Sequence, residues 1–157
     1  MNLRVGIGYD SHRFAEAPEG RELILGGVTI PHDRGLAGHS DADVLTHAVI
    51  DALLGACAQG DIGTHFPPES AEWKDADSMD LLQRTLELLD GKPVNVDATV
   101  IGEKPRLSGH REEIEKSLSD ALGAPVSVKA TTNEGMGWIG RGEGLACTAV
   151  ALVERSA

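Results

Sequence analysis

The chain has few aromatic residues and few cysteines, and each scarcity excludes a class of protein. Aromatic side chains make up 3% of the 157 residues, which is too few for the stacking platforms that bind single-stranded nucleic acids. The two cysteines, Cys57 and Cys147, lie within apolar stretches, so we expect buried small residues rather than a disulfide framework. Such cysteine usage is typical of a reducing compartment.

Basic residues and long apolar runs are also scarce. The chain has 14 Lys and Arg residues against 25 Asp and Glu residues, a formal net charge of -11. This charge repels the phosphates of nucleic acids and anionic membranes, so neither is an expected partner. No apolar run approaches the length of a membrane span, and no signal-peptide pattern precedes the first predicted strand. We therefore expect a cytoplasmic protein, in which an anionic ligand would need local cations, main-chain N–H groups or a divalent metal.

Length and patterning predict a single domain over residues 1–157, with the fold class α/β (α+β). With 41% hydrophobic residues the chain is long enough to bury a core. Strands alternate with helices, which indicates a two-layer sandwich with a mixed β-sheet covered by helices. Gly26-Gly27 marks a small separate β-hairpin, and residues 64–77 read as a surface loop. The strands are expected at 3–12, 94–101, 126–132 and 145–154, and the helices at 40–56, 78–89 and around 114–122.

The helix after Leu36 carries the most informative polar pattern. Ser40 is its expected N-cap, with Asp43 at the capping-box spacing, and Ser78 is the expected N-cap of the next helix, which carries no chemistry. Asp43, His47 and Asp51 stand four residues apart and form a polar stripe on an otherwise apolar helix. Charged groups removed from water need hydrogen bonds, ion pairs or a metal, so this stripe requires a partner.

A partner is available at the end of the first strand. Asp10 and His12 point the same way if the extended conformation persists. Together with His47 they supply three ligands of the types that zinc accepts, which leaves a fourth position for substrate or water. The alternative is that Asp10 caps a turn, His12 is an exposed loop residue and His47 is a satisfied core histidine, because a lone Asp-x-His has many chance matches.

The glycine-rich segment 133–144 matches neither a Walker A motif nor a dinucleotide fingerprint, and no helix is expected behind it. It is either a permissive hairpin connection or a loop whose polar groups approach phosphate oxygens or another subunit. Asp41 and Asp43 are candidate general bases if metal-bound water is the nucleophile. No base is required if a phosphate already on the substrate attacks instead.

Seven short motifs can be compared with known families: GYDSH at 8–12, GGVTIP at 26–31, HSDADV at 39–44, GDIG at 60–63, FP at 66–67, KATT at 129–132 and GRGEG at 140–144. In this order and at this spacing they closely resemble the 2-C-methyl-D-erythritol 2,4-cyclodiphosphate synthase family, and the resemblance covers essentially the whole chain. Ala42 stands where the family often has glycine, and we expect alanine to be harmless in the first turn of a helix.

The resemblance implies an enzyme of the non-mevalonate isoprenoid pathway, a phosphorus-oxygen lyase. It would convert 4-diphosphocytidyl-2-C-methyl-D-erythritol 2-phosphate to the 2,4-cyclodiphosphate with release of CMP. The 2-phosphate attacks the β-phosphorus within one molecule. The resemblance also implies a homotrimer with active sites at subunit interfaces. Each subunit would bind one Zn²⁺, and Mg²⁺ or Mn²⁺ would bind to the substrate diphosphate.

Residue roles follow from the same resemblance. Zinc would be held by Asp10, His12 and His47, and Glu134 would help to hold the second metal. Arg141 and Glu143 would face the trimer axis. Catalytic roles are implied for His39, Thr132 and Glu134, and contacts with the cytidine diphosphate substrate for Asp10, His12, His39, Ser40, Asp61, Ile62, Gly63, Phe66, Lys104, Arg106, Leu107, Thr131, Thr132, Trp138 and Arg141.

Two other functions compete with this reading. A zinc-dependent phosphoester hydrolase would use the open metal position to activate water. A non-catalytic metal-binding assembly protein would use the same three ligands without turnover.

Overall fold

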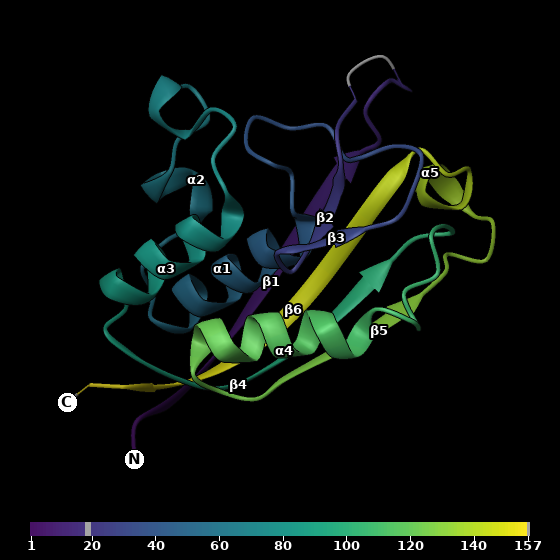
Figure 1. Cartoon of the computed structure of the whole chain (residues 1–157). Coiled ribbons are helices and arrows are strands. Elements are labelled where there is room, and N and C mark those ends of the chain that lie inside the picture. Colours follow the sequence, from purple (N-terminus) through teal and green to yellow (C-terminus); the bar gives the residue numbers. More distant parts are fainter. Residues whose placement is uncertain (18–19, 157) are drawn as a thin grey trace.

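Four strands form one mixed sheet, and helices cover one of its faces (Figure 1). The computed structural model describes residues 1–17 and 20–156. The strand order is β1-β6-β4-β5, in which β4 and β5 run parallel and the other neighbours are antiparallel. This arrangement confirms the predicted two-layer sandwich. The strands are β1 (Leu3–Arg13), β4 (Gly91–Ile101), β5 (Val126–Thr131) and β6 (Gly144–Arg155).

Three longer helices make the second layer. No helix among the described residues is long and apolar enough to cross a membrane. The structure adds two details to the predictions. The segment 64–77, expected as a surface loop, includes a short 3-10 turn, and a short helix lies inside the glycine-rich segment, which a strand and not a helix follows, as expected. The helices are α1 (Val44–Ala56), α3 (Ser78–Leu88) and α4 (Arg111–Leu122), with short turns α2 (Ile62–His65), η2 (Ala71–Trp73) and α5 (Gly137–Gly140).

The N-caps of α1 and α3 differ from the expected ones. Asp43, not Ser40, caps α1, and its side chain accepts a hydrogen bond from Thr46 N. Asp77, not Ser78, caps α3. The α1 helix starts later because Ala42 has a φ of 58°, a left-handed conformation that a right-handed helix cannot include. Ala42 therefore lies before the helix, in a conformation that favours glycine, so the expectation of a harmless alanine in the first helical turn is wrong about its position.

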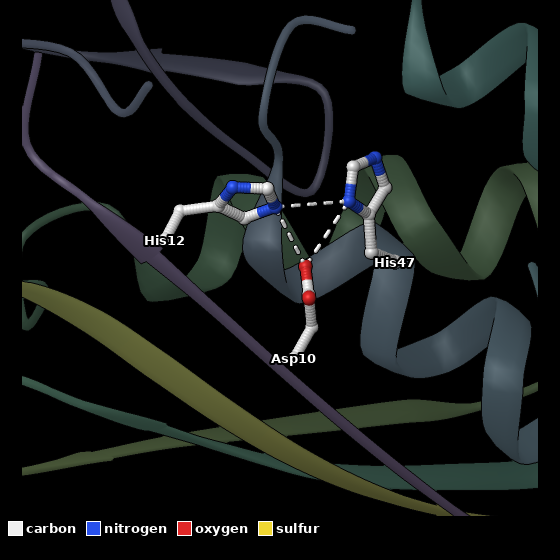
Figure 2. A group of neighbouring side chains, drawn as sticks. All are labelled: Asp10, His12 and His47. Atoms are coloured by element: carbon white, nitrogen blue, oxygen red, sulfur yellow. Dashed lines mark hydrogen bonds and ion pairs between the residues drawn. The ribbon is translucent and has the colours of Figure 1, made fainter. Parts of the chain in front are cut away.

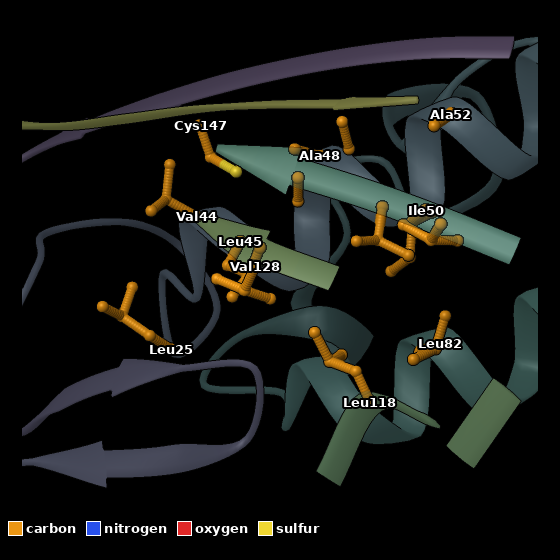
Figure 3. Packing of buried hydrophobic residues seen from close by; sticks show 14 of the residues in the cluster. Leu25, Val44, Leu45, Ala48, Ile50, Ala52, Leu82, Leu118, Val128 and Cys147 are labelled. Atoms are coloured by element: carbon orange, nitrogen blue, oxygen red, sulfur yellow. The ribbon is translucent and has the colours of Figure 1, made fainter. Parts of the chain in front are cut away.

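Helix α1 is the centre of the core. Eleven of its side chains are buried, so the helix is enclosed on almost all sides and not only along one face. The sheet contributes Val128 and Cys147, and the other helices contribute Leu82 and Leu118 (Figure 3). Both cysteines are free and buried, as expected. Burial of this apolar surface is the main favourable contribution to folding.

Strand β1 lies unusually close to α1. A Cβ atom on Gly6 would be 1.9 Å from Ala52 O, and a Cβ atom on Gly8 would be 1.9 Å from Ala48 O. Only residues without a side chain permit this approach of backbone to backbone. The two glycines therefore set the distance between the strand and the helix that carry the predicted metal ligands.

The hairpin of β2 (Leu23–Leu25) and β3 (Val28–Ile30) forms its own two-stranded sheet, as expected. It is nevertheless fastened to α1, because Asp43 accepts hydrogen bonds from Gly26 N at 2.9 Å and Gly27 N at 2.8 Å. The same carboxylate accepts from Thr46 N and Oγ1. Burial raises the pKa of Asp43, and the backbone N–H donors oppose that rise. One side chain thus caps a helix and closes a hairpin turn.

The apolar side of β1 faces away from the helices. Val5, Ile7 and Tyr9 are exposed by 67%, 72% and 57%, and Val150 on the neighbouring strand by 44%. Side chains alternate along a strand, so the residues that face α1 are the even-numbered ones. One face of the sheet therefore has an apolar strip that residues 1–17 and 20–156 do not cover.

We predict that Gly8→Ala lowers the free energy of unfolding by about 3 kcal/mol or more, because its Cβ would clash with the α1 backbone. The matched control is Gly55→Ala on the facing side of the same contact, where the nearest atom would be 3.7 Å away. Alanine is a better helix former than glycine, so this control should gain about 0.5–1 kcal/mol. Urea unfolding of both variants measures the difference, and equal effects would contradict the close-contact explanation.

Candidate metal centre

Three side chains that are distant in the sequence converge at the C-terminal end of β1 (Figure 2). Asp10 and His12 lie on the strand face that contacts α1, as predicted from their spacing, and His47 comes from the first turn of α1. Asp10 Oδ2 is 2.9 Å from His12 Nε2 and 3.1 Å from His47 Nδ1. The two ring nitrogens are 3.3 Å apart. The alternative, that these residues have unrelated structural roles, does not explain this convergence.

The three atoms fit one divalent metal ion. Bonds of about 2.0–2.1 Å from a tetrahedral zinc place neighbouring ligand atoms about 3.3 Å apart. The observed separations of 2.9, 3.1 and 3.3 Å lie within a few tenths of an ångström of that edge. A carboxylate and two imidazoles are also the ligand types that zinc accepts in catalytic sites. Such a site keeps one position open.

The surroundings prepare these groups for a cation. Burial raises the pKa of Asp10, but hydrogen bonds with His12 and His47 outweigh burial and lower its pKa to about 2. Burial lowers the pKa of His12, whereas its hydrogen bond with Asp10 raises that pKa above the usual value. His12 Nδ1 lies 2.8 Å from Ala37 O. A carbonyl oxygen only accepts, so Nδ1 donates to Ala37, and a metal that displaces the proton shared by Nε2 and Asp10 would find the Nε2 lone pair directed at it.

The metal centre opens into a cavity. Seven of the predicted contact residues line it: the metal ligands Asp10 and His12, and also His39, Ser40, Ile62, Gly63 and Phe66. The sequence reading missed three further lining residues, Pro68, Trp73 and Leu81. Trp73 packs edge-on against Phe66 with ring centroids 5.1 Å apart. No motif marks these three: the path of the chain between α2 and α3 brings Pro68 and Trp73 to the cavity, and Leu81 reaches it from α3.

The remaining predicted contact residues are not among those that line this cavity. Asp61 is exposed and caps α2, where it accepts a hydrogen bond from Thr64 N. Glu134 is exposed, and Trp138 is half-buried in α5. A second cavity is lined by Arg106, Leu107, Thr131 and Thr132, and a third by Lys104 and Arg141. The structure of one chain therefore divides the predicted site into separate parts.

Each member of the predicted polar stripe on α1 has a different partner. Asp43 holds the hairpin, His47 faces the metal centre, and Asp51 accepts a hydrogen bond from Ile62 N at 2.8 Å. Burial raises the pKa of Asp51. Its contact fixes the segment that brings Ile62 and Gly63 to the cavity.

The two candidate general bases do not face the cavity. Asp43 is 0% exposed and its oxygens accept from four donors. Asp41 accepts hydrogen bonds from the side chain and the backbone of Ser78. Neither residue lines the metal cavity. The structure therefore offers neither of them as a base for water at the metal.

We predict that Asp10→Asn, His12→Ala and His47→Ala each reduce the amount of tightly bound divalent metal per chain, because each removes one of three ligands. His110→Ala is the control, since His110 lies at the start of α4 and outside the cluster. Elemental analysis after dialysis measures the metal content. Unchanged content in all three variants would contradict the ligand assignment.

Comparison with known proteins agrees with this geometry. The model of the YgbB family matches residues 3–154. A 2-C-methyl-D-erythritol 2,4-cyclodiphosphate synthase of Salinibacter ruber is 56% identical, and the alignment covers 97% of this chain and 99% of the relative. The synthase of Gloeobacter violaceus is 55% identical, with 98% and 96% covered.

Solved structures show the same fold. The bifunctional IspDF of Campylobacter jejuni matches with a TM-score of 0.92 and 35% identity, over 99% of this chain and 43% of that chain. The CDP complex of IspF from Plasmodium falciparum matches with a TM-score of 0.82 and 33% identity, over 99% and 98% of the two chains. Because the family model and these relatives match along almost the whole length, the chain belongs to the YgbB family.

Proposed function

We propose that the chain converts 4-diphosphocytidyl-2-C-methyl-D-erythritol 2-phosphate to 2-C-methyl-D-erythritol 2,4-cyclodiphosphate and releases CMP. The comparisons support a cyclodiphosphate synthase, which is a lyase of isoprenoid biosynthesis. Relatives at 50–56% identity are named 2-C-methyl-D-erythritol 2,4-cyclodiphosphate synthase. The observation that carries the proposal is the convergence of Asp10, His12 and His47 at the wall of a cavity. The buried free cysteines support a reducing, cytoplasmic location.

The metal at this centre is proposed to be Zn²⁺, one per chain. Bound there, it would supply a positive charge for a phosphate oxygen of the substrate. The ionised Asp10 and two neutral imidazoles leave one net positive charge on such a centre, which favours an anionic fourth ligand. His39 Nε2 is 3.1 Å from Ser70 O, so its ring is fixed at the cavity wall.

The proposed reaction needs no general base. The attacking 2-phosphate arrives deprotonated, and catalysis consists of holding two phosphates in line and neutralising their charge. The cavity agrees with this requirement, because neither Asp41 nor Asp43 reaches it. A hydrolase would instead have to activate water, and the comparisons do not favour that alternative.

We also propose a homotrimer with active sites between neighbouring subunits. Two observations support it. The strip of Val5, Ile7, Tyr9 and Val150 leaves exposed apolar surface that another copy could cover. The predicted substrate contacts are divided between separate cavities of one chain, as expected if each site is completed by a neighbour.

Glu134 is proposed to hold Mg²⁺ or Mn²⁺ on the substrate diphosphate. It is exposed and has a φ of 53°, a left-handed conformation that is costly for a side chain other than glycine or asparagine. Hard cations are commonly held by one or two carboxylates together with substrate phosphates. A strained, exposed carboxylate in the glycine-rich segment suits that role.

Turnover in oxygen-18 water separates the synthase from the hydrolase. Cyclisation transfers no solvent oxygen, so we expect unlabelled CMP and unlabelled cyclic diphosphate by mass spectrometry. Solvent label in a product would show hydrolysis and refute the proposal. A protein without CMP release would correspond to the metal-binding assembly protein.

Glu134→Gln should keep its zinc and its oligomeric state but lose most of its turnover and need more magnesium. The amide cannot neutralise or ligate Mg²⁺ as the carboxylate does. Glu112→Gln on the exposed side of α4 is the control and should match the parent. The measurement is initial rate against magnesium concentration at fixed zinc. Superimposable curves for the parent and Glu134→Gln would show that Glu134 has no role in binding magnesium and is only a residue of the loop.

A further inference from the structure

The side of His47 away from the metal centre meets a buried polar contact that the reaction does not explain. His47 Nδ1 faces Asp10 and His12, whereas His47 Nε2 lies 2.8 Å from Ser78 Oγ and 3.2 Å from Ser40 Oγ. Ser78 is 0% exposed and Ser40 is 8% exposed. The shorter contact therefore comes from the first residue of α3, a helix to which the sequence assigned no chemistry.

The donors and acceptors around Ser78 determine its direction. Asp41 is a carboxylate and only accepts, so Ser78 Oγ–H donates to Asp41 Oδ1. Ser78 N donates to the other oxygen of Asp41 at 2.9 Å. With its proton directed to Asp41, Ser78 Oγ has lone pairs left for a donor. The only donor that His47 can offer it is Nε2–H.

We propose that Asp41 and Ser78 are positioning residues that hold His47 as an Nε2–H imidazole, with its Nδ1 lone pair directed at the metal. This inference rests on the metal site of the proposed function. A ligating histidine that donates its other N–H to a polar group is fixed in tautomer and ring orientation and becomes a more basic ligand. His47 Nε2–H donates to Ser78 Oγ, and Ser78 Oγ–H donates to Asp41, so two hydrogen bonds couple the ring to the carboxylate. Ser40 lies at the cavity wall.

Asp41→Asn tests the direction of this hydrogen-bond chain. An asparagine can turn its NH₂ group toward Ser78 Oγ, and Ser78 would then donate to His47 Nε2. That reversal favours the Nδ1–H form of His47, which has no lone pair for the metal. Ser78→Ala removes the acceptor instead. Both variants should weaken zinc binding by roughly 10–100-fold, the usual effect of losing an outer partner of a metal ligand.

Asp77→Ala is the matched control. Asp77 caps α3 and accepts from Met79 N at 2.8 Å, so its loss weakens the same helix start without removing a contact of His47. Zinc affinity is measured by competition with a chelator in the parent and the three variants. The proposal expects a weaker affinity in Asp41→Asn and Ser78→Ala alone. An equal loss in Asp77→Ala would overturn it, because anchoring of α3 would then explain the effect.

A second readout follows the hydrogen bond itself. In the cobalt-substituted protein the Nε2–H proton of His47 gives a paramagnetically shifted signal that disappears when it exchanges with solvent. We expect faster exchange in Ser78→Ala than in the parent and Asp77→Ala. Equal exchange and equal affinity in all variants would refute the positioning role while leaving the metal site intact. A parent protein that binds neither zinc nor cobalt would refute the metal site itself, and this inference with it.

Discussion

The contact between β1 and α1 at Gly6 and Gly8 is the constraint on which the other features depend. Helix α1 is buried on nearly all sides, so its position is fixed by the whole core. The strand can approach it because two residues have no side chain. Further along the same face of β1, Asp10 and His12 stand at the positions that face α1. The short distance between strand and helix therefore brings their side chains within reach of His47. The packing of the core thus determines the geometry of the site.

The segment before α1 concentrates several roles in few residues. Asp43 closes the hairpin and caps the helix, while Asp41 binds the start of α3. Between them Ala42 has a left-handed φ and is fully buried. The carboxylates on either side of this turn therefore accept hydrogen bonds from different elements, Asp43 from the hairpin and α1, and Asp41 from α3. The local strain is therefore balanced by hydrogen bonds to three different elements.

The two layers, and the strand and helix that carry the site, were predicted from periodicity. The three ligands followed from residue chemistry together with the family resemblance. The sequence prediction misplaced the starts of α1 and α3, since Ser40 and Ser78 look like N-caps while the neighbouring aspartates occupy the caps. It also missed Trp73 and Leu81 in the cavity wall. Trp73 is brought to the cavity by an irregular segment, for which a single sequence has no periodic signal, and Leu81 by the docking of α3, which depends on tertiary packing.

The pairing of the edge strand β1 with its neighbour β6 also determines where the two ends of the described chain lie. Leu3 pairs with Glu154, so both ends emerge side by side, whereas Asp10 pairs with Cys147 nearer the opposite end of the strands. From Leu3 to His12 the strand extends about 30 Å at about 3.3 Å per residue. A polypeptide joined at either of these ends would therefore begin at the end of β1 and β6 that is remote from Asp10 and His12.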